Sequence, residues 1–442
     1  MYVKKDRQTG NLFQELFPYG GKLDEKNQWI RLGKLIPWDV MDEVYASYFS
    51  EGRGRPGKES RLITGLLVVK HRKGYSDRGV IEELVENPYV QYFCGYEHFV
   101  TGEEVHYSTL SKSRKRLGKK YFERFESEVL EVVKKGKRIR PRALLTDATV
   151  CPAEITYPTD SKLVNAVREW LCEQIARLRR IGKIKEKIRT YRRKGRQVYL
   201  RFQKKRRKRR KEIRVVQKKL LRYVRRNIVQ LEKLLGEMGE RLRGKLRREL
   251  EKRLEIARMI YAQQWEMIKE KRQRIRDRIV SFHWPEVRPI VRGKEGKEVE
   301  FGPKVMISEV DGYAFLDVLS FDAYNEAKRL LSVLKAYRAR FGRLPERLVG
   351  DRIFGTRWNR TLLKRIKVGE AFQPLGKGKL SKERMKVVKR WNRRRNRVEG
   401  KIGVGKRKYL LDRVRYRIPD GANIWIRLGL LGMNLTTALE RG

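Results

Sequence analysis

The sequence predicts a mixed α/β fold, in which a sheet flanked by helices follows a cluster of short helices and is interrupted by a long basic insertion. Two apolar strand patterns, at 304–310 and 313–319, are joined by an Asp-Gly hairpin signal. A helical pattern at about 323–341 then leads to an apolar strand at 347–351. Paired antiparallel strands, a helix and a parallel strand are typical of a mixed sheet covered by helices. The insertion is predicted by the concentration of positive charge in the middle of the chain.

The overall charge restricts the partners that the chain can have. Its 442 residues include 109 Lys and Arg against 53 Asp and Glu, a formal net charge of +56. Such an excess predicts a polyanionic partner: DNA, RNA or an acidic membrane surface. No run of about eighteen uncharged apolar residues occurs, so no membrane span is expected. Residues 1–10 lack the apolar stretch of a secretory signal. We therefore expect a cytosolic protein that binds nucleic acid.

The first third of the chain predicts a helical DNA-binding domain. Short helical patterns occur at about 38–48, 59–71, 77–86 and 108–117, separated by Gly or Pro. In the last of these, Ser108 is a suitable N-cap and Gly118 a helix stop. A short basic helix that ends a helical cluster suits a helix-turn-helix recognition element, although many small helical domains share this pattern. The basic residues expected to contact DNA are Lys112, Arg114, Lys115 and Arg116.

Two acids stand in matching contexts in the predicted sheet. Asp147 lies in the apolar strand pattern 143–150, which a second extended segment at 154–157 follows, and Asp351 closes the strand at 347–351. A lone acid at a strand end is usually a cap or is solvated. Two acids in one sheet, however, can meet at the edge where α/β sheets commonly bind ligands. Paired carboxylates suit hard ions such as Mg²⁺, and two ions about 4 Å apart support phosphoryl transfer.

The middle of the chain predicts the basic insertion. Residues 176–278 contain 41 Lys and Arg but 11 Asp and Glu, and no proline. Apolar residues recur every three or four positions, which predicts two or three long amphipathic helices with breaks near Gly195 and between Gly236 and Gly244. A solvated helical arm is one interpretation, and the other is contact with a phosphate backbone, which relieves the repulsion between clustered cations. The densest run contains Lys204, Lys205, Arg206, Arg207, Lys208, Arg209 and Arg210.

A third acid, Glu399, ends a basic helical pattern at about 381–399 that precedes an apolar helix at about 422–439. Arg395 lies one turn before Glu399 and would share its helix face. An ordinary surface pair of this kind contributes only a fraction of a kcal/mol. The many neighbouring cations would nevertheless keep Glu399 ionised for metal binding. Glu399 is therefore the candidate for a third acid beside Asp147 and Asp351.

These patterns together resemble the DDE transposases of bacterial insertion sequences, most closely the insertion sequence five group with its Tyr-Arg-Glu-Lys signature. The resemblance covers most of the chain except the basic insertion, which takes the place of a family insertion. It rests on Asp147-Ala148-Thr149, Tyr157-Pro158-Thr159-Asp160, residues 287–294, Gly350-Asp351-Arg352 and the spacing of Arg395, Glu399 and Lys406.

The resemblance implies a ribonuclease H-like catalytic fold in which Asp147, Asp351 and Glu399 form the catalytic, metal-binding triad. It implies two Mg²⁺ ions, for which Mn²⁺ could substitute. Arg395 and Lys406 correspond to the Arg and Lys of the signature and would contact phosphate or DNA. The tyrosine position holds Asn392, so that Trp391 is the alternative stacking residue. Three glycines, Gly400, Gly403 and Gly405, are expected to interrupt the helix before Lys406.

The implied activity is that of a DNA transposase, which cleaves phosphodiester bonds at the ends of its element and transfers the 3′-hydroxyl into target DNA. Its partners would be double-stranded DNA, as terminal inverted repeats and target, and a second copy in a homodimer without membrane contact. The location would be cytoplasmic and nucleoid-associated, in a bacterium or archaeon. A non-catalytic or repurposed nucleic-acid-binding protein and a related metal-dependent nuclease remain alternatives. The expected divisions are an N-terminal segment (1–35), a helical DNA-binding domain (36–135), a split catalytic domain (136–165 and 286–442) and a basic helical insertion (166–285).

Overall fold

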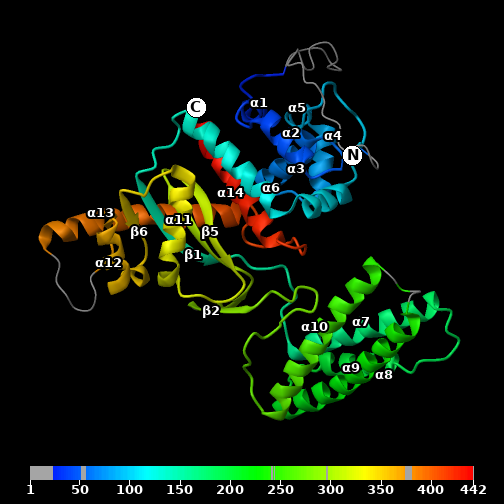
Figure 1. Ribbon diagram of the computed structural model, residues 1–442. Helices are drawn as coiled ribbons and strands as arrows, with labels where there is room; N and C mark the ends of the chain where they lie inside the picture. Colours follow the sequence, from blue (N-terminus) through cyan, green and yellow to red (C-terminus); the bar gives the residue numbers. More distant parts are fainter. Residues whose placement is uncertain are drawn as a thin grey trace. The chain divides into compact units, whose positions relative to one another are not determined.

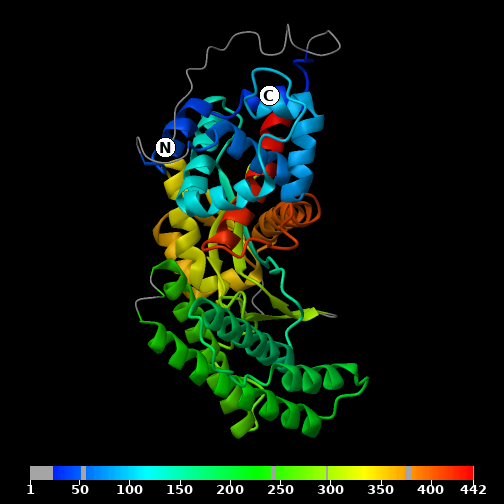
Figure 2. The same cartoon turned by 90° about the vertical axis from the view of Figure 1, so that its right-hand side faces the viewer.

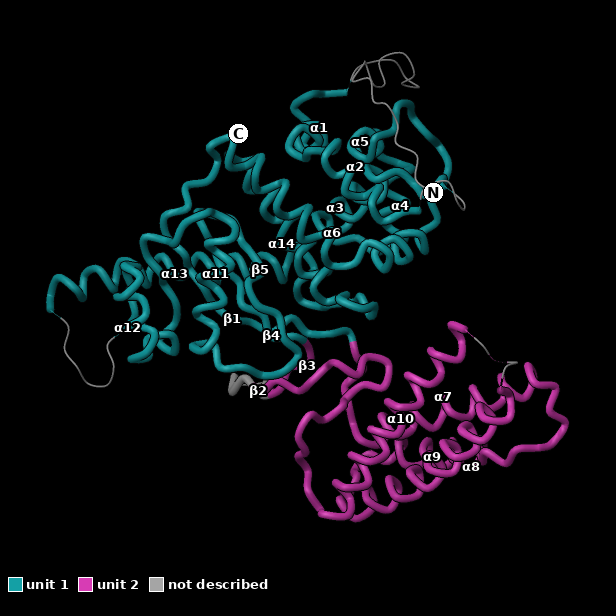
Figure 3. Tube along the Cα trace, in the orientation of Figure 1, with its two compact units in different colours: residues 1–154, 303–442 teal, residues 155–302 magenta. Residues whose placement is uncertain are grey.

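The computed structural model describes residues 23–50, 56–239, 242, 244–294, 297–373 and 381–441. Residues 1–22 of the expected N-terminal segment therefore lie outside the described residues. The chain divides into two compact units, residues 1–154 with 303–442 and residues 155–302 (Figure 3). Unit 1 contains the sheet and the three candidate acids, and unit 2 contains most of the basic helices.

The N-terminal part of unit 1 is a cluster of helices (Figure 1). Apolar side chains from these helices are buried between them. Short polar side chains begin several of them, as where the Ser76 hydroxyl accepts a hydrogen bond from the Gly79 amide at 2.9 Å. The last helix runs well beyond its predicted stop, because the chain kinks at Gly118 (φ 62°) and then continues as helix. The helices are α1 (Gln28–Gly33), α2 (Trp38–Ala46), α3 (Ser60–Lys73), α4 (Asp77–Glu86), α5 (Pro88–Phe93) and α6 (Tyr107–Lys135).

The sheet of unit 1 confirms the predicted mixed topology. Within the described residues its strand order is β5-β4-β1-β6-β7. β1 pairs antiparallel with β4 and parallel with β6; β4 pairs antiparallel with β5, and β6 pairs parallel with β7. The central strand β1 is buried along most of its length, as its run of apolar residues predicts. The strands are β1 (Ala143–Val150), β4 (Lys304–Val310), β5 (Tyr313–Ser320), β6 (Arg347–Val349) and β7 (Gly369–Glu370).

Helices flank this sheet and join it to the N-terminal cluster. α13 packs against β1, β4 and β6, whereas α14 contacts β5 and also α3 and α6 (Figures 1 and 2). α14 is apolar on nearly every side because it lies between the sheet and the helical cluster, which places both in one unit. The helical elements are η2 (Glu326–Arg329), α11 (Leu330–Phe341), η3 (Arg352–Phe354), α12 (Arg357–Arg365), α13 (Lys382–Lys408) and α14 (Gly421–Glu440).

Unit 2 is built on amphipathic helices, as the periodicity of its sequence predicts. Leucine, isoleucine and valine side chains from these helices form one apolar core, and the cations lie on the outside. A hairpin of β2 (Pro289–Lys294) and β3 (Lys297–Phe301) follows the helices. Its described helices are α7 (Asp160–Ile181), α8 (Arg192–Lys204), α9 (Arg210–Met238) and α10 (Lys245–Lys269).

Two predictions based on glycine are wrong, for a common reason. Gly195 lies inside α8, and α13 continues through Gly400, Gly403 and Gly405. At Gly195 a Cβ atom would lie 3.0 Å from the Arg168 side chain, and at Gly405 it would lie 2.6 Å from Leu411. These two glycines therefore allow close packing and do not end their helices. The break predicted between Gly236 and Gly244 is confirmed, because α9 ends at Met238.

The second extended segment predicted at 154–157 is not a strand, although Ala153, just before it, forms an isolated parallel bridge with Val414. None of the helices in the described part of the chain has the length and apolar character needed to cross a bilayer.

Candidate functional site

Asp147 projects from the central strand β1 and is half-buried. Its Oδ1 atom accepts a hydrogen bond from the amide of Ala148 at 2.9 Å. Burial raises the pKa of the Asp147 carboxyl, and this effect exceeds the opposing influence of the Ala148 amide and of the Arg395 guanidinium. Glu326 and Glu399 are close enough to raise the pKa further. Asp147 is therefore an acid whose ionised form needs a nearby cation.

Asp351 comes directly after β6, the parallel neighbour of β1. The register pairs Leu145 with Val349, so each acid stands two residues beyond a paired position on adjacent strands. Asp351 is exposed and caps η3 through a hydrogen bond from the Arg352 amide to its Oδ1 at 2.6 Å. The preceding residue, Gly350, leaves room for Phe354, since a Cβ there would lie 2.7 Å from its ring. The two acids thus share one edge of the sheet, as predicted for ligand sites in such sheets.

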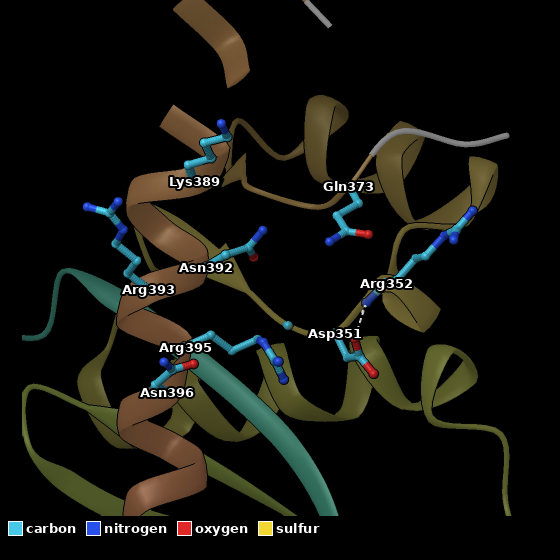
Figure 4. A pocket seen from close by; sticks show the side chains of 9 residues that line it. Asp351, Arg352, Gln373, Lys389, Asn392, Arg393, Arg395 and Asn396 are labelled. Carbon is cyan, nitrogen blue, oxygen red and sulfur yellow. Dashed lines mark hydrogen bonds between the residues drawn. The ribbon is translucent and has the colours of Figure 1, made fainter. Parts of the chain in front are cut away.

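Glu399 and Arg395 lie one turn apart on α13. The Arg395 Nη1 atom is 2.8 Å from Glu399 Oε1, and the Glu399 side chain is 46% exposed. Because Arg395 also lowers the pKa of Asp147, its guanidinium is a counter-charge for both acids. Figure 4 shows the Arg395 side chain extending from α13 toward Asp351. Arg395 therefore pairs with Glu399, acts on the charge of Asp147 and lines the same pocket as Asp351.

An open pocket of about 370 Å³ lies between α13 and the chain after β6 (Figure 4). Among the described residues that line it, Asp351 is the one acid, and the cations are Arg352, Lys389, Arg393 and Arg395. Asn392, at the tyrosine position of the signature, also lines it. Trp391 does not, and contacts the guanidinium groups of Arg347 and Arg394, whose carbons lie 5.2 and 4.6 Å from its ring centre. A pocket with this charge can accept phosphate oxygens.

Lys406 connects α13 to the strand that carries Asp147. Its ammonium group donates hydrogen bonds to Thr149 Oγ1 at 3.0 Å and to the Val150 carbonyl oxygen at 2.9 Å. Because α13 is continuous, Lys406 follows Glu399 by two turns and shares its side of the helix. Lys406 thus fixes the helix of Glu399 against the strand of Asp147.

A fourth carboxylate near Asp147 was not anticipated from the sequence. Glu326, in the first turn of η2, lies close enough to raise the pKa of Asp147, and its side chain pairs with Lys304 at 2.8 Å. It follows an Asn325 N-cap and so has the pattern of a helix-start acid. No local sequence signal distinguishes it from such an acid; only its position in the fold does.

The described residues contain no group of three or more His, Cys, Asp or Glu side chains arranged to hold a metal ion. Asp147 and Glu399 are within electrostatic reach of each other, and Asp351 shares the pocket with Arg395. Each of the three acids has carboxylate oxygens, which are the ligands that hard divalent ions such as Mg²⁺ prefer. At present Arg395 provides the positive charge between them.

The basic residues predicted on α6 fall into two groups. Lys112, Lys115 and Arg116 are exposed. Arg114 is buried, 3% exposed, and its guanidinium forms two hydrogen bonds with Asp77, at 2.9 and 2.6 Å. Arg114 therefore stabilises the helical cluster and is not available to DNA in this arrangement.

The predicted basic run spans the end of α8, a connecting segment and the start of α9. Six of its seven residues have no ion-pair partner among the described residues, and Lys205 pairs with Glu212 at 3.0 Å. Every residue of the run is exposed. The run thus presents a continuous cationic surface on unit 2, available to a polyanion.

Comparisons with known proteins agree with the resemblance at a coarser level. Residues 18–116 match a family described as a transposase domain, DUF772. A Rhizobium meliloti protein, described as uncharacterized protein ORF8 in the nfe locus, is 36% identical over 144 residues, which make up 32% of this chain and 69% of that protein. No solved structure matches the chain.

Proposed function

The chain belongs to a transposase-like family, and we propose that it is a DNA transposase that cuts the ends of its element and joins them to target DNA. One observation carries this proposal beyond the family. Asp147 on β1 and Asp351 just after β6 each stand two residues beyond a paired position of these parallel strands, and Glu399 on α13 lies within electrostatic reach of Asp147. Arg395 pairs with Glu399, lowers the pKa of Asp147 and lines a pocket with Asp351, and this supports a shared site for the three acids in a strongly basic protein.

The chemistry of the three acids fits divalent metal ions. Asp147, Asp351 and Glu399 would hold two Mg²⁺ ions, or Mn²⁺ as a substitute, which when bound neutralise charge on the attacking and leaving oxygens. The raised pKa of Asp147 supports this role, because a half-buried carboxylate is stabilised by a positive charge beside it. The mixed sheet that carries the acids supports a ribonuclease H-like fold.

The protein's own cations would bind and orient the DNA. Arg352, Lys389 and Arg395 line the pocket beside Asp351 and can hold the oxygens of the phosphate that reacts. Lys406, bonded to β1, acts as a positioning residue for Glu399 and does not contact the phosphate directly. Asn392 can donate a hydrogen bond from the same side of the pocket.

Two other surfaces would bind DNA outside the site. Lys112, Lys115 and Arg116 on α6 would contact terminal inverted repeats; they are exposed and lie within the segment that matches the transposase domain. The run 204–210 on unit 2 would contact flanking or target backbone. Joining two ends requires two active sites, so that a homodimer is the expected working form. The cytoplasm of a bacterium or archaeon, at the nucleoid, is the corresponding location.

A second candidate function is non-catalytic DNA binding by a repurposed transposase. The observation that favours it is the lack of a three-acid metal cluster among the described residues. This protein would share the salt-sensitive affinity for DNA but would not cleave it. A related nuclease would cleave without joining the ends.

The test is a strand-cleavage and joining assay with purified full-length protein, a DNA end, plasmid and Mg²⁺. We expect joined product from the wild type and no product from Asp147→Ala or Glu399→Gln, with end binding retained in both. The matched control is Glu383→Gln, which makes the same change at an exposed acid of the same helix, and we expect it to be active. Cut but unjoined DNA would identify a nuclease. Binding without any cut, or full activity of Asp147→Ala, would refute the catalytic proposal.

A further inference from the structure

Unit 2 contains a second cationic pocket, which is lined by residues of unit 2 and includes none of the three candidate acids. It has a volume of about 330 Å³ and lies where α7 and α9 begin and α10 ends. Asp160 is its only acid. Its cations are Arg210, Arg214, Lys271, Arg272 and Arg278.

The single acid of this pocket is already neutralised by its own neighbours. Arg278 donates a hydrogen bond to Asp160 Oδ1, and the amide of Gln264 donates to the same oxygen at 3.0 Å. Arg272 in turn pairs with Glu270 at 2.9 Å. Arg210, Arg214 and Lys271 have no ion-pair or hydrogen-bond partner among the described side chains. The pocket therefore carries about three uncompensated positive charges, which repel one another unless an anion is present.

The helix that begins at the pocket adds to this positive potential. α9 has 29 residues, begins at Arg210 and has Arg209 at its N-cap position, with no side chain capping its first amides. The free amides at the start of a helix attract anions, whereas a cation at the N-cap position is unfavourable. Glu212, in the first turn, is already paired with Lys205. An anion in the pocket would compensate both the helix end and the cations.

A buried amide in the pocket also lacks a partner. Gln217 on α9 is 5% exposed and lines the pocket, and the described residues give its side chain no hydrogen bond. Because Gln217 lines the pocket and no described residue pairs with its amide, the amide can bond to a ligand there. The amide NH₂ of Gln217 can donate to an oxygen atom placed among the cations. Charge and hydrogen bonding thus point to the same kind of ligand, a tetrahedral oxyanion.

We propose that this pocket binds one phosphate group of a DNA backbone, separately from the acid site. That the phosphate belongs to DNA rests on the proposed function, whereas the binding of a phosphate group by the pocket does not depend on transposition. Arg210 ends the exposed cationic run and also lines the pocket, so a backbone that follows the run reaches the pocket. The cationic run alone would bind a DNA strand at no fixed position along it, whereas one phosphate held in the pocket would fix that position.

The test compares two charge-matched double variants of the full-length protein. Arg214→Ala with Lys271→Ala removes two free cations of the pocket. Lys218→Ala with Arg222→Ala removes two exposed cations of α9 that do not line it. The probes are inorganic phosphate, measured by equilibrium dialysis, and a DNA duplex, measured by fluorescence anisotropy over a range of salt.

We expect the wild type to bind phosphate saturably, and the pocket variant to bind it at least tenfold more weakly while the control changes less than twofold. For the duplex, the slope of log affinity against log salt should fall by about one in the pocket variant, as expected for one lost phosphate contact. Gln217→Leu, which keeps the charge, should weaken phosphate binding severalfold. Its folding is checked by thermal unfolding.

Three results would overturn the proposal: equal weakening by both double variants, phosphate binding that does not saturate, or bound phosphate that the duplex does not displace. The last would identify the pocket as a site for free phosphate. Failure of the proposed function is distinguished by the cleavage assay, because Asp147→Ala should leave phosphate binding at this pocket unchanged.

Discussion

Arg114→Met is the substitution that most directly separates a structural arginine from a DNA-binding one. The Arg114 guanidinium forms two hydrogen bonds with Asp77 and lies 4.0 Å above the ring of Tyr416. Lys70 donates to the same carboxylate at 2.6 Å. Two cations thus share one acid within a largely buried cluster, in which Arg114 is 3% and Lys70 4% exposed.

The expected loss follows from the burial of this network. Removing one partner of a buried ion pair typically costs about 3–5 kcal/mol, because the remaining charge loses its compensation. The Asp77 side chain is 24% exposed and keeps Lys70, so the lower end, about 3 kcal/mol, applies here. Methionine fills most of the space of the arginine stem, which limits the additional cost of a cavity.

The measurement is urea unfolding of the full-length protein followed by tryptophan fluorescence, with duplex affinity measured separately under native conditions. The matched control is Lys115→Met, one residue further on the same helix; Lys115 is exposed and has no ion-pair partner in the part of the chain that the structure describes. We expect Arg114→Met to unfold at lower urea and to bind DNA with unchanged affinity per folded molecule. Lys115→Met should retain its stability and bind DNA more weakly. If Arg114→Met instead weakened DNA binding tenfold at unchanged stability, the structural role of Arg114 would be refuted.

Three further predictions concern single side chains. Burial lowers the pKa of Lys70 from 10.5 to about 8. Between about pH 8 and pH 10 only the unfolded chain therefore binds this proton, and the free energy of unfolding should rise by up to about 1.4 kcal/mol per pH unit. Urea midpoints that do not rise with pH in the wild type, or that rise equally in Lys70→Met, would contradict this. Asp147→Asn should abolish cleavage, because it removes a proposed metal ligand. It should also stabilise the fold by about 0.5–2 kcal/mol, because burial disfavours the charged form of Asp147. A lower melting temperature of Asp147→Asn would contradict the expected stabilisation. Lys406→Met should cost about 2–3 kcal/mol through two lost hydrogen bonds, and unchanged stability with lost DNA affinity would instead favour direct phosphate contact.

Much of the fold could be predicted because its signals are local. The strand at 143–150 and the hairpin strands around 304–320 follow from short apolar runs and one turn dipeptide, and the structure has them at nearly the predicted positions. Glycine was a poorer guide. Gly195 and Gly405 lie within helices because a neighbouring side chain occupies the space of their Cβ, a contact that depends on tertiary packing. Glycine occurs both where a helix ends and where a neighbouring side chain packs closely against a helix, and the sequence alone does not distinguish the two cases.

The side chains of the site illustrate the same limit. Arg114 and Lys115 are adjacent and equally basic, yet one is buried against Asp77 and the other is exposed. Periodicity places Arg114 on the face of Leu110 and Leu117, which are both buried, and this signal was available in the sequence. Glu326 had no such signal, since its approach to Asp147 comes from the fold of η2 near the sheet.

Two of the three candidate acids can be identified from the local sequence, whereas the third depends on tertiary packing. Asp147 and Asp351 are recognisable because each follows an apolar strand, and the parallel register then brings them to one edge. Glu399 reaches that edge only through α13, which packs against β1, β4 and β6 and is bonded to β1 by Lys406, seven residues further along the helix. Carboxylates gathered in this way repel unless a cation lies among them, and Arg395 supplies it from the same helix. Arg395 and a divalent ion would therefore compete for the same acids, so that replacing Arg395 with methionine should raise the affinity for the ion if the three acids form its site.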